Sequence, residues 1–220
     1  MMEAEMNAHY VLEGKGPMKA NFILTDLHPD ISAWRKASRS SKAEALHYVP
    51  TPVDALSTDS KDLVKLVLPA SQAHGIKTFR LFSLSFHHFD DEPATRILRS
   101  ILRNDEGFAI FELQGRVLVD LMFMLVMFPF IVLGSWFDQW GNWARLFWTG
   151  VVPVLPIVFA FDGFVSCLRT RTESELMNLI KDAAKGLDGG LDGWTFESGE
   201  KLHAWPTGKL RYLIGVKKAL

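Results

Sequence analysis

Two long apolar stretches limit what this chain can fold into. Residues 121–137, "LMFMLVMFPFIVLGSWF", and residues 146–161, "LFWTGVVPVLPIVFAF", contain no charged side chain. A helix needs about 20 apolar residues to cross a bilayer, with a lower limit of about 17. The second stretch also contains Pro153 and Pro156, which bend or break a helix. The pair predicts either buried helices that cover a sheet or a hairpin that contacts a membrane, and shallow contact is favoured over full spanning.

The composition excludes several other classes of protein. The chain has 220 residues, of which 48% are hydrophobic, and its net charge is −1. A chain of this size buries one sizeable core, and a charge so close to zero gives no sign of nucleic-acid binding. Cys167 is the single cysteine, which excludes an intrachain disulfide and a multi-cysteine zinc site. The first ten residues lack the basic and apolar regions of a secretory signal, so a cytoplasmic location is expected.

The rest of the sequence alternates between strand and helix patterns. Buried strands are expected over 21–27, 77–86 and 107–113, helices over 28–48, 90–104 and 172–187, a short extended piece over 48–56, and a helix or loop over 59–76. The segments "WTFESGEKL" and "KLRYLIGVK" are expected to form a terminal hairpin around "PTG" at 206–208. This order predicts an α/β fold with a parallel sheet and an antiparallel edge.

Polar residues follow the predicted strands, where ligands of parallel α/β sheets bind. Asp26 has the place of an acid that accepts hydrogen bonds from ribose hydroxyls, or of a turn aspartate before Pro29. Asp54 is in position to accept a bond from an adenine amine, although a loop aspartate is the more common role. Glu112 ends the third strand, and an ion pair with Arg116 is its expected role.

The stretch "SFHHF" contains two adjacent histidines, His87 and His88. Adjacent side chains point to opposite sides of a strand or turn, and the i, i+4 spacing of helical zinc ligands is absent, so no metal site is expected. One histidine can face the cleft as a proton acceptor. The alternative is that both histidines are structural and hold the loop.

Several segments, taken in order, resemble the class I S-adenosylmethionine-dependent methyltransferases. The similarity runs from about residue 20 to the C-terminus, and "SFHHF" and "DGFVSCLRT" are its most specific parts. The segments are "FILTDLHPDISAW", "YVPTPVDA", "TFRLFSLSFHHFDDEPATRILRSIL", "GFAIFEL", "RLFWTGVVPVLPIVFAFDGFVSCLRTRTESEL" and "LRYLIGVKK".

The resemblance implies S-adenosyl-L-methionine as cofactor and a small lipophilic molecule as methyl acceptor. The positions that match cofactor contacts follow three strands and are Asp26 with Leu27, Asp54 with Ala55, and Ser85 with Phe86. In the family, the first pair lies at the ribose, the second at the adenine, and the third under the methionine part. His87 and His88 are the matching candidates for a catalytic base.

One departure from the family concerns its first strand, which ends in a glycine-rich loop of the form D-x-G-x-G. No such strand and loop precede residues 21–27, and "EGKGPM" at 13–18 does not replace them. The expected fold is therefore a Rossmann-like methyltransferase sheet lacking its first strand. The chain is then a shortened form of a longer protein, or the two flanking strands pair directly, or a partner or second copy supplies a strand.

The expected organisation has three parts. Residues 1–116 form a partial cofactor-binding half, residues 117–171 a hydrophobic helical hairpin insertion, and residues 172–220 a C-terminal helix with an antiparallel hairpin. Membrane association is expected through residues 121–161. The expected function is methyl transfer; the alternative is a non-catalytic, membrane-associated protein of this fold, or an accessory or cyclase-like protein that has lost the donor site.

Overall fold

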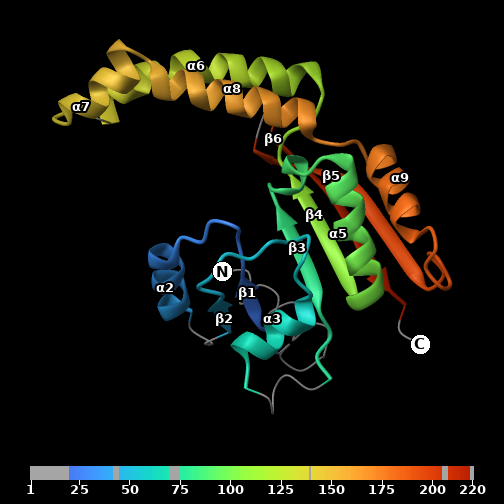
Figure 1. Cartoon of the computed structure of the whole chain (residues 1–220). Helices are drawn as coiled ribbons and strands as arrows, with labels where there is room; N and C mark the ends of the chain where they lie inside the picture. Colours follow the sequence, from blue (N-terminus) through green and yellow to red (C-terminus); the bar gives the residue numbers. More distant parts are fainter. Residues whose placement is uncertain (1–19, 42–44, 70–74, 139, 205–207, 219–220) are drawn as a thin grey trace, which may run out of the picture. The chain divides into compact units, whose positions relative to one another are not determined.

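The computed structural model describes residues 20–41, 45–69, 75–138, 140–204 and 208–218 (Figure 1). The chain divides into two compact units, Met1–Ile76 and Lys77–Leu220. The fold is mixed α/β, as the alternation of strand and helix patterns predicts.

The first unit contains a small parallel sheet and two helices. Its elements are β1 (Phe22–Leu24), α2 (Ile31–Ser40), β2 (Leu46–Tyr48) and α3 (Ser60–Val67). β1 and β2 pair in parallel, with Phe22 opposite Leu46 and Leu24 opposite Tyr48. The side chain of Asp30 caps α2 by accepting a hydrogen bond of 3.0 Å from the Ala33 N–H.

The helix expected over 28–48 is too long. The helix α2 ends at Ser40, and residues 46–48 form β2 instead. The serines at the end of α2 explain the early stop, because serine side chains compete for backbone hydrogen bonds and weaken helices. The Ser38 hydroxyl accordingly donates to the Leu46 carbonyl at 2.7 Å and fixes the helix end to the strand.

The second unit contains a four-stranded mixed sheet. Its strands are β3 (Phe79–Ser83), β4 (Gly107–Glu112), β5 (Trp194–Ala204) and β6 (Gly208–Lys217), in the order β3-β4-β6-β5. β3 and β4 are parallel, whereas β6 is antiparallel to both of its neighbours. The expected terminal hairpin is therefore present, and its second strand lies inside the sheet; part of its turn, 206–207, lies outside the described residues.

Two helices of the second unit pack together beside the sheet, α5 (Asp91–Asn104) and α9 (Glu173–Ala184). The helix α5 buries the apolar face that its sequence spacing predicts, which consists of Ala94, Ile97, Leu98, Ile101 and Leu102. These side chains and the buried residues of β4 form the core of the unit.

The helix α9 begins with a capping box, as the sequence predicts. The Thr172 hydroxyl accepts a bond from the Glu175 N–H, and the Glu175 carboxylate accepts one of 2.8 Å from the Thr172 N–H. This backbone bond, together with the guanidinium of Arg116, lowers the pKa of Glu175 from its usual 4.5. The folded chain therefore favours the ionised form, so this contribution to stability is full above about pH 5 and is lost as the pH falls through the lowered pKa.

Replacing Glu175 with Gln is therefore expected to lower the free energy of unfolding at neutral pH by less than about 1 kcal/mol, because the side chain is partly exposed. The loss relative to the wild type should shrink as the pH is lowered to about 3. Urea unfolding followed across this range measures it. Glu173→Gln, in the same helical turn, is the control, and an equal pH dependence in both variants would contradict the role of Glu175.

The segment 117–171 is helical. It contains α6 (Leu118–Asp138), α7 (Trp143–Leu146), the short π-helix η2 (Phe147–Val151) and α8 (Val154–Arg169), and α6 and α8 pack side by side along their length (Figure 1). In the described part of the chain, α6 is long and apolar enough to cross a membrane. The helical segments Trp143–Val151 and Val154–Arg169 are long and apolar enough to cross a membrane only if they are taken together as one span that is broken by a bend.

Candidate functional site

The chain leaves β3 through a strained turn. Leu84 has a φ of 54°, in the left-handed region that side chains other than glycine rarely adopt. Its N–H donates to the Phe111 carbonyl at 2.9 Å, which holds the turn against β4. The next residues form a single 3-10 turn, η1 (Phe86–His88), so the strain positions this turn at the carboxyl ends of the two parallel strands.

A buried histidine and a buried glutamate meet at this turn. The Nδ1 atom of His87 lies 2.8 Å from Oε2 of Glu112, and the His87 backbone N–H donates to Oε1 at 3.2 Å. Each residue is only 5% exposed. The backbone bond fixes the turn to the end of β4, while the side-chain bond fixes the orientation of the imidazole.

The carboxylate also selects the tautomer of His87. An ionised carboxylate only accepts hydrogen bonds, so Nδ1 carries the hydrogen and Nε2 of the neutral ring keeps a lone pair. Nε2 makes no hydrogen bond within the described residues, and it is not among their buried unpaired atoms. Nε2 is therefore the ring nitrogen that is left to accept a proton, as in a histidine base that a carboxylate orients.

Two arginines, one at the end of α8 and one just after it, hold the same turn. The Arg169 guanidinium donates to the carbonyls of His87 at 2.9 Å and His88 at 3.0 Å, and Arg171 donates to the Phe89 carbonyl at 2.6 Å. The two most specific sequence segments, "SFHHF" and "DGFVSCLRT", are therefore bonded to each other in space. Backbone carbonyls held by planar guanidinium groups leave the turn little freedom to move.

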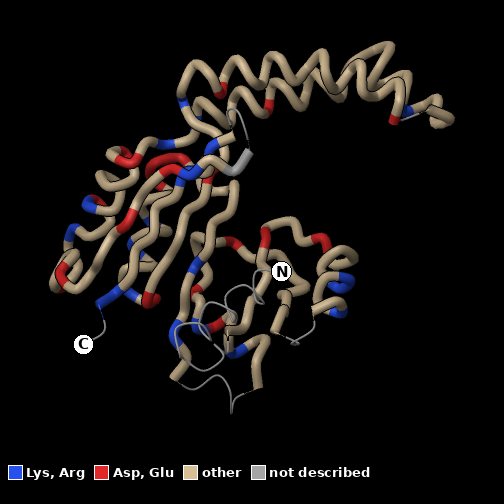
Figure 2. Tube along the Cα trace, turned by 180° about the vertical axis from the view of Figure 1, so that it is seen from behind, with Lys and Arg blue, Asp and Glu red and all other residues tan. Residues whose placement is uncertain are grey.

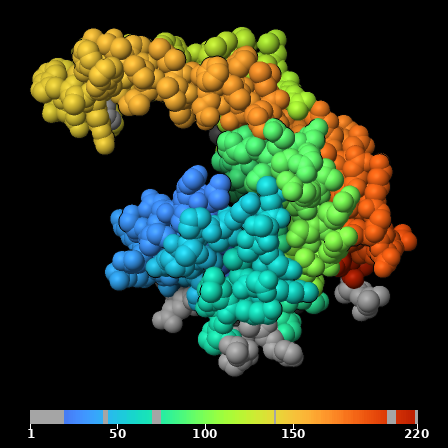
Figure 3. Space-filling view, viewed as in Figure 1, coloured from blue at the N-terminus to red at the C-terminus, as the bar shows by residue number. Residues whose placement is uncertain are grey.

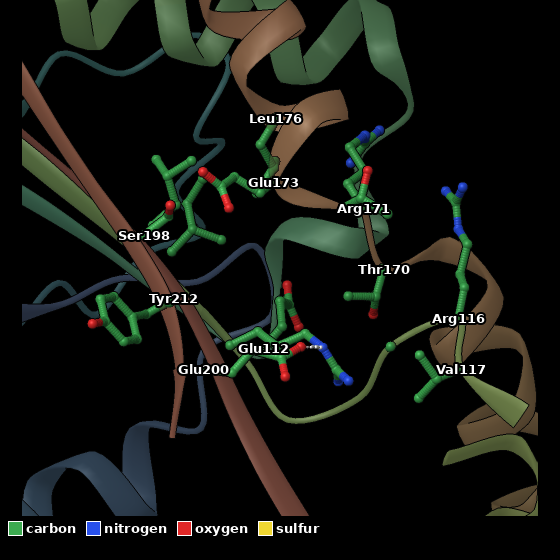
Figure 4. A pocket seen from close by; sticks show the side chains of 16 residues that line it. Glu112, Arg116, Val117, Thr170, Arg171, Glu173, Leu176, Ser198, Glu200 and Tyr212 are labelled. Carbon is green, nitrogen blue, oxygen red and sulfur yellow. Dashed lines mark hydrogen bonds and ion pairs between the residues drawn. The ribbon is translucent and has the colours of Figure 1, made fainter. Parts of the chain in front are cut away.

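A cavity of about 260 Å³ lies beyond the end of β4 (Figure 4). Its charged lining has three carboxylates and three guanidinium groups: Glu112, Glu173, Glu200, Arg116, Arg171 and Arg211. Arg211 donates to Glu200 at 2.7 Å and to the buried Asp120 at 2.9 Å. A hydrogen bond from Lys209 and the charge of Arg211 lower the pKa of Glu200. His87 is not part of the cavity lining, so Glu112 connects the cavity to the histidine.

In the first unit, Asp26 and Asp54 follow the carboxyl ends of the parallel strands β1 and β2. The Val53 N–H donates to the Asp26 carbonyl at 2.8 Å, which brings the two segments together. Both side chains are exposed and each accepts one turn bond, Asp26 from the His28 N–H at 2.8 Å and Asp54 from the Leu56 N–H at 2.9 Å. Each carboxylate therefore forms a turn and still has free lone pairs.

The cofactor-binding and catalytic residues that the sequence predicts lie partly in the first unit and partly in the second. Asp26, Leu27, Asp54 and Ala55 lie in the first unit, whereas Ser85, Phe86, His87 and His88 lie in the second. Phe86 is buried and packs edge-on against Phe82 and Phe89. The two histidines differ: His87 is buried and held by Glu112, whereas the ring of His88 is exposed and lies 4.2 Å from that of His87 between centroids.

The expected ion pair between Glu112 and Arg116 is wrong. Arg116 donates to Glu175 at 2.7 Å and to the Leu168 carbonyl at 2.7 Å, and Glu112 binds His87 instead. The chain turns away after the strand, so four residues of sequence separation do not bring the two side chains together. The signal that was missed is an acid at the end of one buried strand and a histidine just after its parallel neighbour.

Metal binding finds no support in the described residues, which contain no group of three or more His, Cys, Asp or Glu side chains able to hold an ion.

Comparisons with known proteins do not show the family of this chain. No family model matches it, and no curated protein matches it at a significant level. A solved structure from Rhodobacter sphaeroides, described as a Zn-dependent alcohol dehydrogenase, is similar at 11% identity over 96% of this chain and 80% of that chain, with a TM-score of 0.45. A likeness this weak carries no argument about fold or function.

Proposed function

We propose that this protein is a methyltransferase-like enzyme that uses S-adenosyl-L-methionine and a small lipophilic acceptor. The observation that carries the proposal is the His87–Glu112 pair at the carboxyl ends of β3 and β4. The "SFHHF" segment that supplies His87 is also the segment whose family counterpart lies beside the methionine part and the acceptor. We further propose a cytoplasmic location with membrane association through residues 121–161.

The topology supports the proposal in two ways. Each unit has a pair of parallel strands with polar residues after their carboxyl ends, as expected for a Rossmann-like sheet. The strand order β3-β4-β6-β5 contains the antiparallel C-terminal hairpin that the strand pattern predicts. Within the described residues, β1 pairs only with β2 and β3 pairs only with β4.

The donor set of the first unit fits the cofactor. Ribose hydroxyls and an adenine amine are hydrogen-bond donors, and the exposed carboxylates of Asp26 and Asp54 keep free lone pairs to accept from them. When bound, S-adenosyl-L-methionine supplies the methyl group.

The residues of the second unit would handle the proton of the acceptor. Nε2 of His87 accepts the proton that leaves the hydroxyl or amine of the acceptor, and the ring becomes an imidazolium. Glu112 is the positioning residue: it holds the tautomer and stabilises the imidazolium that forms. The arginine clamp keeps the ring from moving during this step.

Titration calorimetry with S-adenosylhomocysteine tests the donor site. We expect binding in the micromolar range, weakened about 10- to 100-fold by Asp26→Asn, because a hydrogen bond to a charged group contributes about 1.5–3 kcal/mol. Asp59→Asn is the matched control, since Asp59 is another aspartate of the first unit that accepts a backbone bond, here from Lys61.

Absence of binding by a chain that still shows a cooperative thermal transition would overturn the enzyme proposal. It would favour the alternative of a non-catalytic, membrane-associated protein of this fold, or of an accessory or cyclase-like protein. Equal weakening by Asp26→Asn and Asp59→Asn would contradict the role of Asp26 at the ribose.

A further inference from the structure

The helix α6 is apolar on every side that faces away from α8. Its exposed large apolar side chains range from 39% to 86% exposure: Leu118, Val119, Met122, Phe123, Leu125, Val126, Phe130, Leu133, Trp136 and Phe137. The space-filling view shows the α6–α8 hairpin, in yellow, orange and green, with much of its length uncovered by the rest of its own unit (Figure 3). A helix that is apolar all round belongs in an apolar surrounding, not at a water-facing surface.

The contacts of α6 with η2 and with α8 use small residues. A Cβ added to Gly163 would lie 2.6 Å from Sδ of Met124, and one added to Gly150 would lie 3.0 Å from Oγ of Ser135. Ser166 and Cys167 are further small residues of α8 that are buried. Small side chains between the helices and large apolar ones outside are the arrangement of helix pairs in lipid.

The dimensions and the backbone of the hairpin suit a bilayer. The 21 residues of α6 span about 31 Å at 1.5 Å each, and the hydrocarbon core of a bilayer is about 30 Å thick. The second leg bends by 54° after Val151. At this bend the Val152 N–H donates to the Phe147 carbonyl at 2.7 Å and the Ile157 N–H to the Pro153 carbonyl at 3.0 Å, so these backbone donors stay paired, as lipid requires.

Indole rings collect where the hairpin turns. Trp136, Trp140, Trp143 and Trp148 are between 40% and 69% exposed. Figure 2 shows that charged residues are few along the hairpin and that some of them lie at its ends. Tryptophan at the end of an apolar helix is typical of a membrane interface.

The position of Asp162 limits how deep the hairpin can insert into a bilayer. Asp162 is exposed on α8, next to Gly163, which lies level with Met124 of α6. From Met124 to Asp138, α6 rises about 21 Å at 1.5 Å per residue. This is shorter than the hydrocarbon core of about 30 Å, so local thinning of the bilayer would bring the tryptophans and Asp138 to the far interface. A carboxylate is costly in the hydrocarbon core and is tolerated at its boundary.

We propose that the hairpin inserts end-on into a phospholipid bilayer, with its tryptophan-rich tip first and Asp162 at the near boundary of the hydrocarbon core. This inference rests on the proposed membrane association and goes beyond it by fixing the direction of insertion. A hairpin lying along the surface would leave one apolar side of α6 in water. A second copy of the chain would likewise cover only one side.

The test uses single cysteines labelled with an environment-sensitive fluorophore in a Cys167→Ser background. Val119→Cys lies at the base of the hairpin, Phe130→Cys lies in its middle, and Ser174→Cys on α9 is the control outside it. The full chain is bound to vesicles of phosphatidylcholine and phosphatidylglycerol. Quenching is compared for nitroxides at the lipid headgroup and deep in the acyl chain. We expect the ratio of deep to shallow quenching to rise at least about 3-fold from Val119 to Phe130.

Equal ratios at the two hairpin positions would overturn end-on insertion and leave the membrane association standing. A chain that does not float with the vesicles would overturn both, and a dimer in solution without vesicles would show that a second copy covers the hairpin. None of these outcomes bears on the binding of S-adenosylhomocysteine, which tests the proposed enzyme function separately. Asp162→Leu should move the Val119 label deeper, and an unchanged ratio would contradict Asp162 as the boundary.

Discussion

Replacing His87 with Gln is expected to lower the rate of methyl transfer by about 100- to 10,000-fold, the range that an oriented general base contributes. Gln keeps a donor for Glu112 but has no nitrogen that accepts a proton, so the loss should fall on the chemical step. The initial rate of radiolabel transfer from S-adenosyl-L-methionine to 4-octylphenol, a lipophilic acceptor with an ionisable hydroxyl, measures it.

His88→Gln is the matched control for this experiment. His88 is the neighbouring residue, but its ring is exposed, and Glu112 binds His87. The control should keep a rate within about 3-fold of the wild type, well inside the effect of losing a base. Affinity for S-adenosylhomocysteine should stay unchanged in both variants. Equal loss in the two variants, or in neither, would show that His87 does not act as the base.

Replacing Asp105 with Ala is expected to lower the free energy of unfolding by about 3–5 kcal/mol, the usual result of removing one partner of a buried ion pair. The Asp105 side chain is 0% exposed and lies 2.9 Å from Nε of Arg80, which is itself 12% exposed. It also accepts a bond of 2.6 Å from the Thr78 hydroxyl. The variant removes the carboxylate that faces a largely buried guanidinium at the junction of α5, β3 and β4, whereas the bond from Arg80 to Ser100 remains.

Urea unfolding followed by circular dichroism measures this loss. Glu92→Ala removes an acid from the same helix, but its pair with Arg96 has side chains 74% and 56% exposed. This control should lower the free energy of unfolding by less than about 1 kcal/mol. If Asp105→Ala were no more destabilising than the control, the buried pair would not be a main support of the second unit.

Elements with a strong local pattern could be predicted from the sequence. Over residues 90–104, Ile97, Leu98, Ile101 and Leu102 repeat at helical spacing, and α5 has nearly those bounds and buries those side chains. The capping box of α9 is equally local, because Thr172 and Glu175 are one helical turn apart. Such elements depend on residues close in sequence, so the sequence alone contains most of their determinants.

Elements that depend on distant partners could not be predicted in the same way. The end of α2 and the start of β2 depend on the pairing of β2 with β1. The local helical pattern of residues 28–48 contains no information about this pairing. Similarly, Glu112 and Arg116 are close in sequence, yet the partner of Glu112 is 25 residues away. In both cases, tertiary contacts overrode a local pattern.

The candidate site shows the same division. The sequence indicated "SFHHF" as the segment of interest but could not rank His87 above His88, because both follow the same strand. The strained Leu84, the carboxylate of Glu112 and the two arginines of the "DGFVSCLRT" region and its continuation make the two histidines different. Apart from the strained Leu84, these residues come from other parts of the second unit.

The strand β6 lies between β4 and β5, although every other element precedes it in the sequence. On the ribosome, the sheet of the second unit therefore stays open along one side of β4 until Gly208–Lys217 has been made. The apolar α6–α8 hairpin emerges well before that moment. The order of synthesis thus presents the hairpin to its surroundings first, and the sheet that holds Glu112 is completed only afterwards.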